Sequence, residues 1–329
     1  MILIVGFDTD SHVQEVRRHL RAEPLVVDTG QFPASVLLDA RFSGESESIR
    51  LMRENHRWID LADVHAVWYR RINPLGLDPA ITDSTARLFA WSEANEALLG
   101  TWYSLDCFWM NSPVADEIAL RKIRQLQVAR RLGLSVPETL VTNDPAAAAA
   151  FIESNDSGKV IRKAFRNIRE APRETTVVTA GDLRLIDLVR YTPVIFQTFV
   201  PCRADFRVTI VDGEIFAASI ESEPQYAADY RMGLTSAQVT ACELPTDVTD
   251  RLMQLMEAFD LRYGAIDLRL TPEGDYVFFE VNPAGEYMFI SSRTGQPISA
   301  AIAAALERHD ENGCGCVKTN GSLAESGLQ

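Results

Sequence analysis

Hydrophobic positions in the first third of the chain fall into short continuous runs and into stretches with helical spacing. Short apolar runs bounded by turn residues predict buried strands, and apolar positions three or four apart predict helices. We predict strands at 2–5, 25–28, 64–69 and 107–110, and helices at 11–20 and 84–100. This strand–helix rhythm indicates an open α/β domain, but no Gly-x-Gly-x-x-Gly dinucleotide fingerprint follows the first strand.

The rest of the chain mixes both patterns. We predict one long helix at 116–132, whose apolar face carries Ile118, Ile123, Leu126, Ala129 and Leu132. Further helices are predicted at 145–154, 246–259 and 298–306, strands at 136–143, 159–165, 175–179 and 194–200, and a hairpin at 206–211 and 214–219. From residue 310 to 329 the sequence is polar, Gly-rich and unpatterned, which predicts a disordered tail.

Composition and charge argue against several classes of function. The net charge of −14 argues against general nucleic-acid binding, which needs a basic surface. The chain has no apolar run of the roughly 20 residues that span a bilayer, and its N-terminus reads as a strand rather than a signal peptide. Five irregularly spaced cysteines fit reduced thiols in a cytoplasm, and Cys314-Gly-Cys316 lacks the second pair of a zinc site.

The most informative pattern is a second hairpin near the C-terminus. The run 265–270 alternates apolar and polar residues, a turn follows at 271–274, and 276–281 is aromatic and β-branched. Glu280 and Asn282 share one face because side chains alternate along a strand. A turn with an even number of residues places Asp267 on that face as well. Two carboxylates and an amide oxygen suit Mg²⁺ beside substrate phosphates.

Alternating acids on a strand are also typical of a solvated face, and this hairpin alone leaves both interpretations open. The residues that follow favour the metal site. A strand that ends in Glu280-x-Asn282-Pro283-x-Gly285 resembles the metal-binding strand of ATP-grasp ligases. In that superfamily, an acid on one strand, a Glu on the next and an Asn two residues later hold Mg²⁺ between the phosphates of ATP. The resemblance implies these roles for Asp267, Glu280 and Asn282.

Three further segments resemble the nucleotide site of the same superfamily. Lys122 opens Lys-x-x-x-Leu-x-x-Ala-x-x-x-Gly-x-x-x-Pro-x-Thr, and Lys163 follows the apolar pair Val160-Ile161. A lysine at a strand end suits a contact to the α- and β-phosphates. Taken without its context, the pattern favours Lys122 as a surface cation on a helix. The resemblance implies that adenine is held by the backbone of the hinge strand, residues Gln197, Thr198, Phe199 and Val200.

Two arginines are candidates for stabilising charge on a transferred phosphoryl group. Arg207 stands in Asp205-Phe-Arg207 at the mouth of a strand, and Arg231 stands in Asp229-Tyr-Arg231 on a loop. Each has an alternative role as an ion-pair partner of Asp205 or Asp229.

Less specific motifs resemble those of one branch of the superfamily. This branch comprises the microviridin-type maturases of ribosomal peptides, or graspetide synthetases. These motifs are Trp68-Tyr-Arg-Arg71, Asp229-Tyr-Arg231, Asn282-Pro-Ala-Gly-Glu-Tyr and Thr294-Gly-x-Pro-Ile. The resemblance covers about residues 1–309. It implies an ATP-grasp fold with α/β architecture: an N-terminal open α/β pre-ATP-grasp domain (1–113), a central lobe (114–199), a C-terminal lobe with the Mg²⁺ site (200–309) and the tail (310–329).

The chain departs from the family pattern in two places. The loop after Lys163 (164–172) has no glycine, so it offers fewer backbone N–H groups to phosphates, and Arg166 or Arg169 are candidates to replace them. Glu286 stands where the family motif has Gln, which puts any contact of that amide in doubt.

The branch implies a cytoplasmic ligase that uses ATP and Mg²⁺. It would activate Glu or Asp side chains of a precursor peptide, made of a leader and a core, as acyl phosphates. Ser or Thr hydroxyls, or Lys amines, of the same core would then close ester or amide rings. ADP and phosphate would be released. The resemblance also implies a homodimer.

Two other functions stay open from the sequence. One is a ligase of free amino acids, or one that adds glutamates to a protein C-terminus. The other is an inactive ATP-grasp module that binds peptides as a scaffold. The sequence leaves open the identity of the peptide, the ring pattern, the leader-binding residues, and ester versus amide products.

Overall fold

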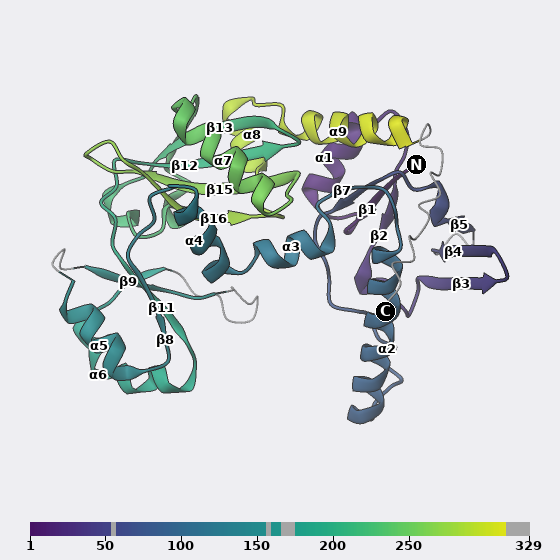
Figure 1. The fold of residues 1–329 in the computed structure, drawn as a ribbon, viewed down its shortest axis with the longest axis horizontal. Helices are drawn as coiled ribbons and strands as arrows, with labels where there is room; N and C mark the ends of the chain where they lie inside the picture. Colours follow the sequence, from purple (N-terminus) through teal and green to yellow (C-terminus); the bar gives the residue numbers. More distant parts are fainter. Residues whose placement is uncertain (54–56, 156–158, 166–174, 314–329) are drawn as a thin grey trace, which may run out of the picture. The chain divides into compact units, whose positions relative to one another are not determined.

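The structure, a computed structural model, describes residues 1–53, 57–155, 159–165 and 175–313. The chain divides into two compact units: Met1–Met110 with Ile302–Gln329, and Asn111–Ala301. Figure 1 labels the elements of both units. Among the described helices, none is long and apolar enough to cross a lipid bilayer.

The first unit is built on a parallel sheet. Its strand order is β2-β1-β6-β7 and all neighbouring pairs are parallel. The elements are β1 (Ile2–Val5), α1 (Ser11–His19), β2 (Leu25–Val27), β6 (Ala66–Tyr69), α2 (Ser84–Tyr103) and β7 (Phe108–Met110). Leu3 and Val5 of β1 pack in one core with Leu98 and Trp102 of α2. The predicted open α/β domain is therefore confirmed.

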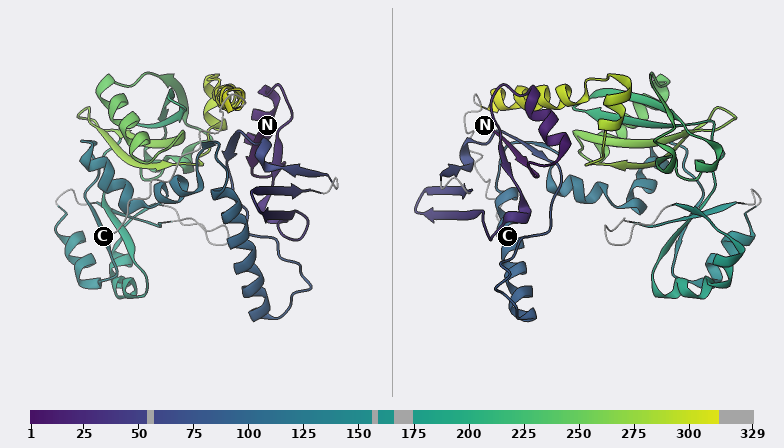
Figure 2. Two further views of the ribbon diagram at one scale, coloured as in Figure 1. Left: turned by 45° about the vertical axis from the view of Figure 1, so that its right-hand side comes forward. Right: turned by 180° about the vertical axis from the view of Figure 1, so that it is seen from behind.

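A small antiparallel sheet in this unit was not predicted. It comprises β3 (Leu37–Ser43), β4 (Ser46–Met52) and β5 (Trp58–Asp60), in the order β3-β4-β5. Two short 3₁₀ turns, η1 (Thr29–Gln31) and η2 (Leu61–Asp63), flank it in sequence. Only Leu51 of these three strands is fully buried, so the sequence has no strong hydrophobic alternation to reveal them. Figure 2 shows these strands and the long helix α2 from two further directions.

The closing helix α9 (Ile298–Gly313) is longer than predicted. The expectation that the chain loses structure at residue 310 is wrong for 310–313. Asp310 Oδ1 accepts hydrogen bonds from the Met1 amine at 2.5 Å and pairs with His65 Nδ1 at 3.1 Å. The His309 ring stacks on Phe108 with centroids 3.6 Å apart. These contacts hold the last helical turns, whereas Cys314 and Cys316 lie outside the described residues.

The second unit contains two antiparallel sheets. The smaller has the order β10-β9-β11-β8 and is covered by short helices (Figure 1). Its elements are β8 (Thr139–Thr142), α5 (Pro145–Glu153), β9 (Val160–Lys163), β10 (Thr176–Val177), α6 (Ala180–Arg184), η3 (Ile186–Tyr191) and β11 (Val194–Thr198). Ala148, Val160, Val189 and Phe196 form its core. The strands predicted at 136–143 and 175–179 exist but are shorter than expected.

The larger sheet has five strands in the order β14-β13-β12-β15-β16. Its elements are β12 (Ala204–Val211), β13 (Glu214–Glu221), η4 (Pro224–Tyr226), η5 (Tyr230–Gly233), β14 (Gln238–Cys242), α7 (Thr246–Ala258), β15 (Tyr263–Leu270), β16 (Tyr276–Asn282) and α8 (Met288–Thr294). One face packs apolar side chains such as Phe206 and Leu268 against α7 residues such as Leu252. Because side chains alternate, the opposite face of β12 and β15 carries the charged residues.

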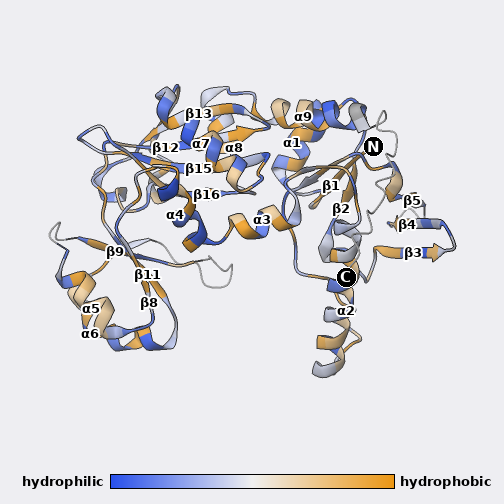
Figure 3. Cartoon of the chain, viewed as in Figure 1, coloured by the Kyte–Doolittle hydropathy of each residue, from blue (hydrophilic) through white to orange (hydrophobic). Residues whose placement is uncertain are grey.

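The single helix predicted at 116–132 is wrong. The chain forms α3 (Pro113–Ala119) and α4 (Lys122–Arg131), separated by Leu120 and Arg121; the ψ of 98° at Arg121 is extended. Ile118 and Ile123, assigned to an apolar face, are 46% and 58% exposed. Figure 3 shows α4 as largely hydrophilic. The break makes Lys122 the first residue of α4.

Asn111 joins the start of β15 to the end of β16. Its side-chain oxygen accepts from the backbone N–H groups of Arg262 (2.7 Å) and Tyr263 (2.9 Å). Its Nδ2 donates to the carbonyls of Tyr263 (2.9 Å) and Pro283 (3.0 Å). Tyr263 lies beyond the last residue that β16 pairs with β15, so the Asn111 amide takes the place of a further strand residue. A fully buried amide with four partners fixes these two chain segments together.

Asn111→Ala is expected to destabilise the protein by about 3 kcal/mol, because it leaves buried backbone donors and acceptors without partners. Chemical denaturation of the variant measures the loss. Asn143→Ala removes an exposed asparagine before α5 and should change the unfolding free energy by less than about 0.5 kcal/mol. Equal stability of the two variants would contradict the role given to Asn111.

Candidate active site

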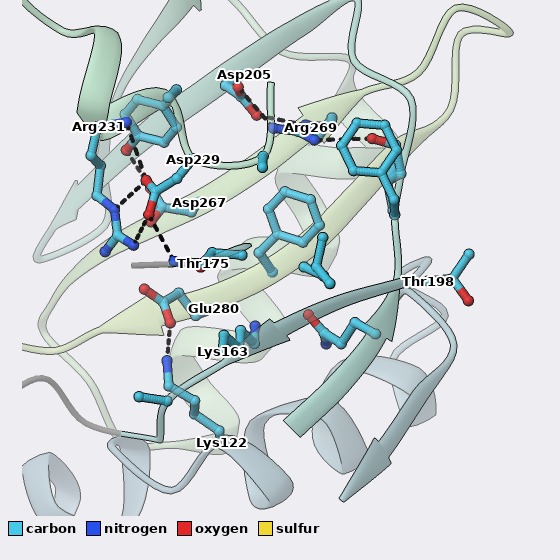
Figure 4. A pocket seen from close by; sticks show the side chains of 18 of the residues that line it. Lys122, Lys163, Thr175, Thr198, Asp205, Asp229, Arg231, Asp267, Arg269 and Glu280 are labelled. Atoms are coloured by element: carbon cyan, nitrogen blue, oxygen red, sulfur yellow. Dashed lines mark hydrogen bonds and ion pairs between the residues drawn. The ribbon is translucent and has the colours of Figure 1, made fainter. Parts of the chain in front are cut away.

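A cavity of about 270 Å³ lies in the second unit, lined by residues of both of its sheets and of α4. Figure 4 shows the side chains that surround it. Ten of the residues singled out from the sequence line this cavity: Lys122, Lys163, Gln197, Thr198, Phe199, Val200, Arg231, Asp267, Glu280 and Asn282. Arg207, the other arginine assigned to the transferred phosphoryl group, does not line it. Residues that lie up to 160 positions apart in the sequence are thus brought together around one space.

Asp267 and Glu280 are direct cross-strand partners in β15 and β16. The route to this register differs from the prediction. Leu270 pairs with Tyr276, so the loop is 271–275 and has an odd number of residues, which by itself would pair Asp267 with Phe279. A β-bulge between Asp267 and Leu268 shifts the ladder by one residue and leaves Phe279 as the extra residue. The bulge therefore places the two carboxylates opposite each other.

Asp267 is held by two groups on its Oδ1 atom. Arg207 Nη1 donates to it at 2.8 Å and the Tyr230 hydroxyl donates at 3.0 Å. The Asp267 side chain is only 11% exposed. Burial raises the pKa of Asp267 above its ordinary value, although the Arg207 charge opposes this shift. Arg207 is thus a partner of Asp267, and not of Asp205 as the sequence alternative supposed.

Glu280 forms an ion pair with Lys122 at the start of α4. Burial would raise the pKa of Glu280, but the charges of Lys122 and Lys163 prevail and lower it to about 2. Asn282 lies two residues further on the same face, and its Oδ1 accepts from the Ala284 N–H at 3.1 Å. The cavity therefore has a permanently charged carboxylate at the centre of a group of cations.

The donor set fits a hard divalent cation. Two carboxylates and one amide offer oxygen only, and Mg²⁺ typically takes one or two carboxylates and completes its shell with water and substrate phosphates. Within the residues that the structure describes, no group of three or more His, Cys, Asp or Glu side chains is placed to hold a metal ion by itself. The arrangement therefore suits a cation that arrives with phosphates better than a closed structural zinc site.

Gln125, which the sequence analysis did not single out, positions Lys122 over Glu280. β16 is an edge strand, so the outer N–H and C=O of Val281 need partners. Gln125 Nε2 donates to the Val281 carbonyl at 2.8 Å, and Gln125 Oε1 accepts from the Val281 N–H at 3.1 Å. The same amide donates to the carbonyl of Ala119, where α3 ends. Gln125 thereby fastens α4 to the strand that carries Glu280 and Asn282.

Lys163 ends β9 and faces the same carboxylates from the smaller sheet (Figure 4). Burial lowers its pKa from 10.5 to about 8, and the neighbouring charges of Lys122 and Arg231 act in the same direction. Glu280 and Asp267 oppose the shift only in part. Near neutral pH this amine is still mostly protonated, and an added anion would stabilise its charge.

The hinge residues differ in how much of their backbone is engaged. β11 is a central strand, and Gln197 pairs with Thr139 on one side and Ile161 on the other. Gln197 is 1% exposed, and its Nε2 donates to Thr139 Oγ1 at 2.8 Å. Phe199 and Val200 follow the end of the strand and line the cavity. The Phe199 N–H already donates to the Lys159 carbonyl at 2.9 Å, and the Val200 carbonyl accepts from Arg269 Nη1. A backbone contact to a nucleotide base stays a prediction for the hinge residues.

Arg231 belongs to a short loop at the rim of the cavity. Its Nε and Nη2 hold both oxygens of Asp229 at 2.7 and 2.6 Å, and its side chain is 43% exposed. The hydrogen bonds to Asp229 raise the pKa of Arg231 above its ordinary value. Tyr230 connects the same loop to Asp267, so Arg231 is placed relative to the carboxylates by its own neighbour in sequence.

Sequence reasoning missed several lining residues, notably Asp205, Tyr230, Arg269 and Phe279. One signal was present in the sequence. The motif Asp-x-Arg occurs in both β12 and β15, and two antiparallel copies can pair each Asp with the Arg of the other strand. Arg166 and Arg169, proposed substitutes for a Gly-rich loop, lie outside the described residues. Glu286 is exposed and does not line the cavity.

The lowered pKa of Lys163 predicts a proton linkage. Phosphates that bind beside Lys163 should raise its pKa, so at about pH 8.5 nucleotide binding should take up a fraction of a proton that is absent at pH 7. Calorimetric titration with ADP in buffers of different ionisation enthalpy measures this uptake. Lys163→Met should abolish it, and an unchanged uptake in that variant would assign the proton to another group.

Comparison with known proteins gives consistent matches. The family described as "MvdD pre-ATP grasp domain" matches residues 1–117. The chain is 33% identical to the macrocyclase MdnC from Microcystis aeruginosa MRC, solved with the precursor peptide MdnA; the match covers 93% of this chain and 98% of that one, with a TM-score of 0.83. A comparison with curated proteins found no match.

Two other solved structures are similar at lower identity. A RiPP-associated ATP-grasp ligase from Chryseobacterium gregarium, in complex with ADP and a leader and core peptide, is 26% identical over 93% of this chain and 96% of that chain, with a TM-score of 0.85. The ATP-grasp ligase PsnB, complexed with a phosphomimetic variant of a minimal precursor, Mg and ADP, is 27% identical over 94% and 98% of the two chains, with a TM-score of 0.76.

Proposed function

The chain belongs to the family of ATP-grasp ligases that macrocyclise ribosomally made precursor peptides, and from this premise we propose that it closes intramolecular ester or amide bonds in such a peptide. Glu or Asp side chains of the peptide core are activated by ATP. Ser or Thr hydroxyls, or Lys amines, of the same core are the acceptors.

One observation supports the proposal most directly. Asp267 and Glu280 are register partners on one face of a sheet, and Lys122, Lys163 and Arg231 surround them in a single cavity. This combination of two carboxylates and three cations suits the binding of a polyphosphate with its metal ion. It suits covalent catalysis by a nucleophilic side chain of the protein less well. The relatives solved with ADP and with Mg and ADP carry out their chemistry on the same fold.

We assign the roles as follows. Asp267, Glu280 and Asn282 would hold Mg²⁺, which neutralises phosphate charge when it is bound. Lys163 and Lys122 contact the phosphates as point charges. Arg207 acts through Asp267, which it holds in place, rather than by reaching the cavity. Phe199 and Val200 meet the adenine end, beside Gln197 and Thr198.

The reaction has two displacements. A carboxylate oxygen of the peptide attacks the γ-phosphorus, the bond to the β–γ bridging oxygen breaks, and ADP leaves. A hydroxyl or amine of the same peptide then attacks the acyl carbon. The bond from the acyl carbon to the phosphate oxygen breaks, and the released phosphate takes up the proton of the attacking group. Arg231, at the rim of the cavity, stabilises the negative charge that develops on the transferred phosphoryl group.

We also propose that the reaction takes place in the cytoplasm, where ATP is available. Cys107, Cys202 and Cys242 are all free thiols, in keeping with a reducing compartment.

The direct test is incubation of the enzyme with ATP, Mg²⁺ and a precursor peptide encoded beside its gene. Each ring closure removes one water from the peptide, which mass spectrometry detects. ADP release without loss of water from any peptide would favour transfer to a separate amino acid. If no neighbouring peptide stimulates ADP release, the result would favour an inactive module that binds peptides as a scaffold.

Glu280→Gln should lower peptide-dependent ADP formation by about 100-fold or more, because the amide removes the charge that holds the cation. The fold should persist, with a Tm within about 4 °C of the parent. Glu273→Gln, in the exposed turn between β15 and β16, is the control and should turn over normally. Near-normal turnover of Glu280→Gln would count against the metal assignment.

Arg231→Ala should reduce kcat by about 100-fold while ADP affinity changes by less than about threefold, because its contact is made mainly in the transition state. Steady-state kinetics and calorimetry separate the two effects. Arg251→Ala, on the exposed side of α7, should leave both unchanged. A pure loss of affinity would remove Arg231 from the transition-state role.

A further inference from the structure

Arg269 is a buried cation at one end of the cavity with an unusually complete set of contacts. It is 3% exposed. Its Nε and Nη2 donate to the two oxygens of Asp205 at 2.8 and 3.1 Å, and its Nη1 donates to the carbonyl of Val200 at 2.9 Å. The guanidinium carbon lies 5.2 Å from the centre of the Phe279 ring. All four residues line the cavity.

The bond from Arg269 to Val200 connects the two sheets of the second unit. Arg269 belongs to β15 of the larger sheet, and Val200 follows β11 of the smaller sheet. Asp205, the second residue of β12, is the register partner of Arg269. The guanidinium therefore fixes where the chain leaves the hinge strand and where it enters the larger sheet.

Arg269 and Asp267 lie close together on β15. Asp267 precedes it by two residues on the same face, which in an antiparallel strand is a separation of roughly 7 Å. Asp267 lies beside Glu280 and Arg231 (Figure 4), and Arg269 bonds the hinge residue Val200. We call these the phosphate end and the hinge end of the cavity. One rigid strand thus carries the anchors of both ends.

We propose that Arg269 is a positioning residue for the nucleotide, an inference that rests on the function proposed above. It holds Val200 and the hinge at a fixed distance from Asp267, so that the base and the phosphates of one ATP molecule reach their contacts together. Phe279, the extra residue of the β-bulge, packs beside the guanidinium and keeps it in this plane.

The chemistry requires arginine. A guanidinium is planar and can clamp both oxygens of a carboxylate while a further N–H group points elsewhere. A lysine keeps the charge beside Asp205 but has a single nitrogen, which cannot hold both carboxylate oxygens and Val200 in the same geometry. Arg269→Lys therefore separates the positioning role from the mere presence of a buried positive charge.

The experiment compares two ligands in the full-length protein by calorimetry with Mg²⁺ present. ADP needs both ends of the cavity, whereas inorganic pyrophosphate needs only the phosphate end. Arg269→Lys should weaken ADP binding about tenfold and change pyrophosphate binding by less than about twofold. Arg262→Lys, an exposed arginine just before β15 that pairs with Asp212, is the matched control and should alter neither.

Asp205→Asn provides a second variant if Arg269→Lys fails to fold, because the amide is isosteric and leaves the bond to Val200 possible. It should also weaken ADP binding selectively. Equal losses for ADP and pyrophosphate, or no loss of ADP binding, would overturn the positioning role. Failure of the parent protein to bind ADP would refute the proposed function itself. The two failures are distinguishable, because this one is seen in the unmutated chain and the failure of the positioning role is seen only in the variants.

Discussion

Two buried ion pairs between β12 and β15 are the constraint on which the cavity depends. Asp205 faces Arg269 and Arg207 faces Asp267, so the two strands carry the same charges in opposite order. Removing any one of the four would leave a charge with too little solvent to compensate for it, which is costly in a protein interior. The pairs thereby stabilise the charged face of β12 and β15 on the side of the cavity. The other face of the same strands packs into the apolar core.

The edge strand β16 depends on side chains for partners that a further strand would otherwise supply. Gln125 bonds both backbone groups of Val281, and Asn111 completes the ladder at Tyr263. Both amides are buried. Asn111 precedes α3, and Gln125 lies in the first turn of α4. The Gln125 contacts that satisfy the backbone of Val281 therefore also hold α4, and with it Lys122, beside Glu280. Stability and the geometry of the site are here properties of the same hydrogen bonds.

Much of the site was predictable because it consists of local patterns. The strand that ends in Glu280-x-Asn282 has an alternation that puts both side chains on one face in any context. Lys163 was placed by its position at the end of an apolar run. The helix at 116–132 was mispredicted because its periodicity continues through the break, and only the tertiary contacts of Gln125 show why α3 ends where it does. The weakly buried strands β3 to β5 left no pattern to detect.

The sequence by itself determined the resemblance to the family, the strand–helix order, and the residue types that line the cavity, because these depend on composition and on spacing within single elements. The tertiary structure decided the partners. The bulge at Phe279 chose the register of Asp267 and Glu280, and the pairing of β12 with β15 gave Arg207 to Asp267 and Arg269 to Asp205. Register and ion pairing between distant segments arise from the packing of the whole sheet, and no single segment encodes them.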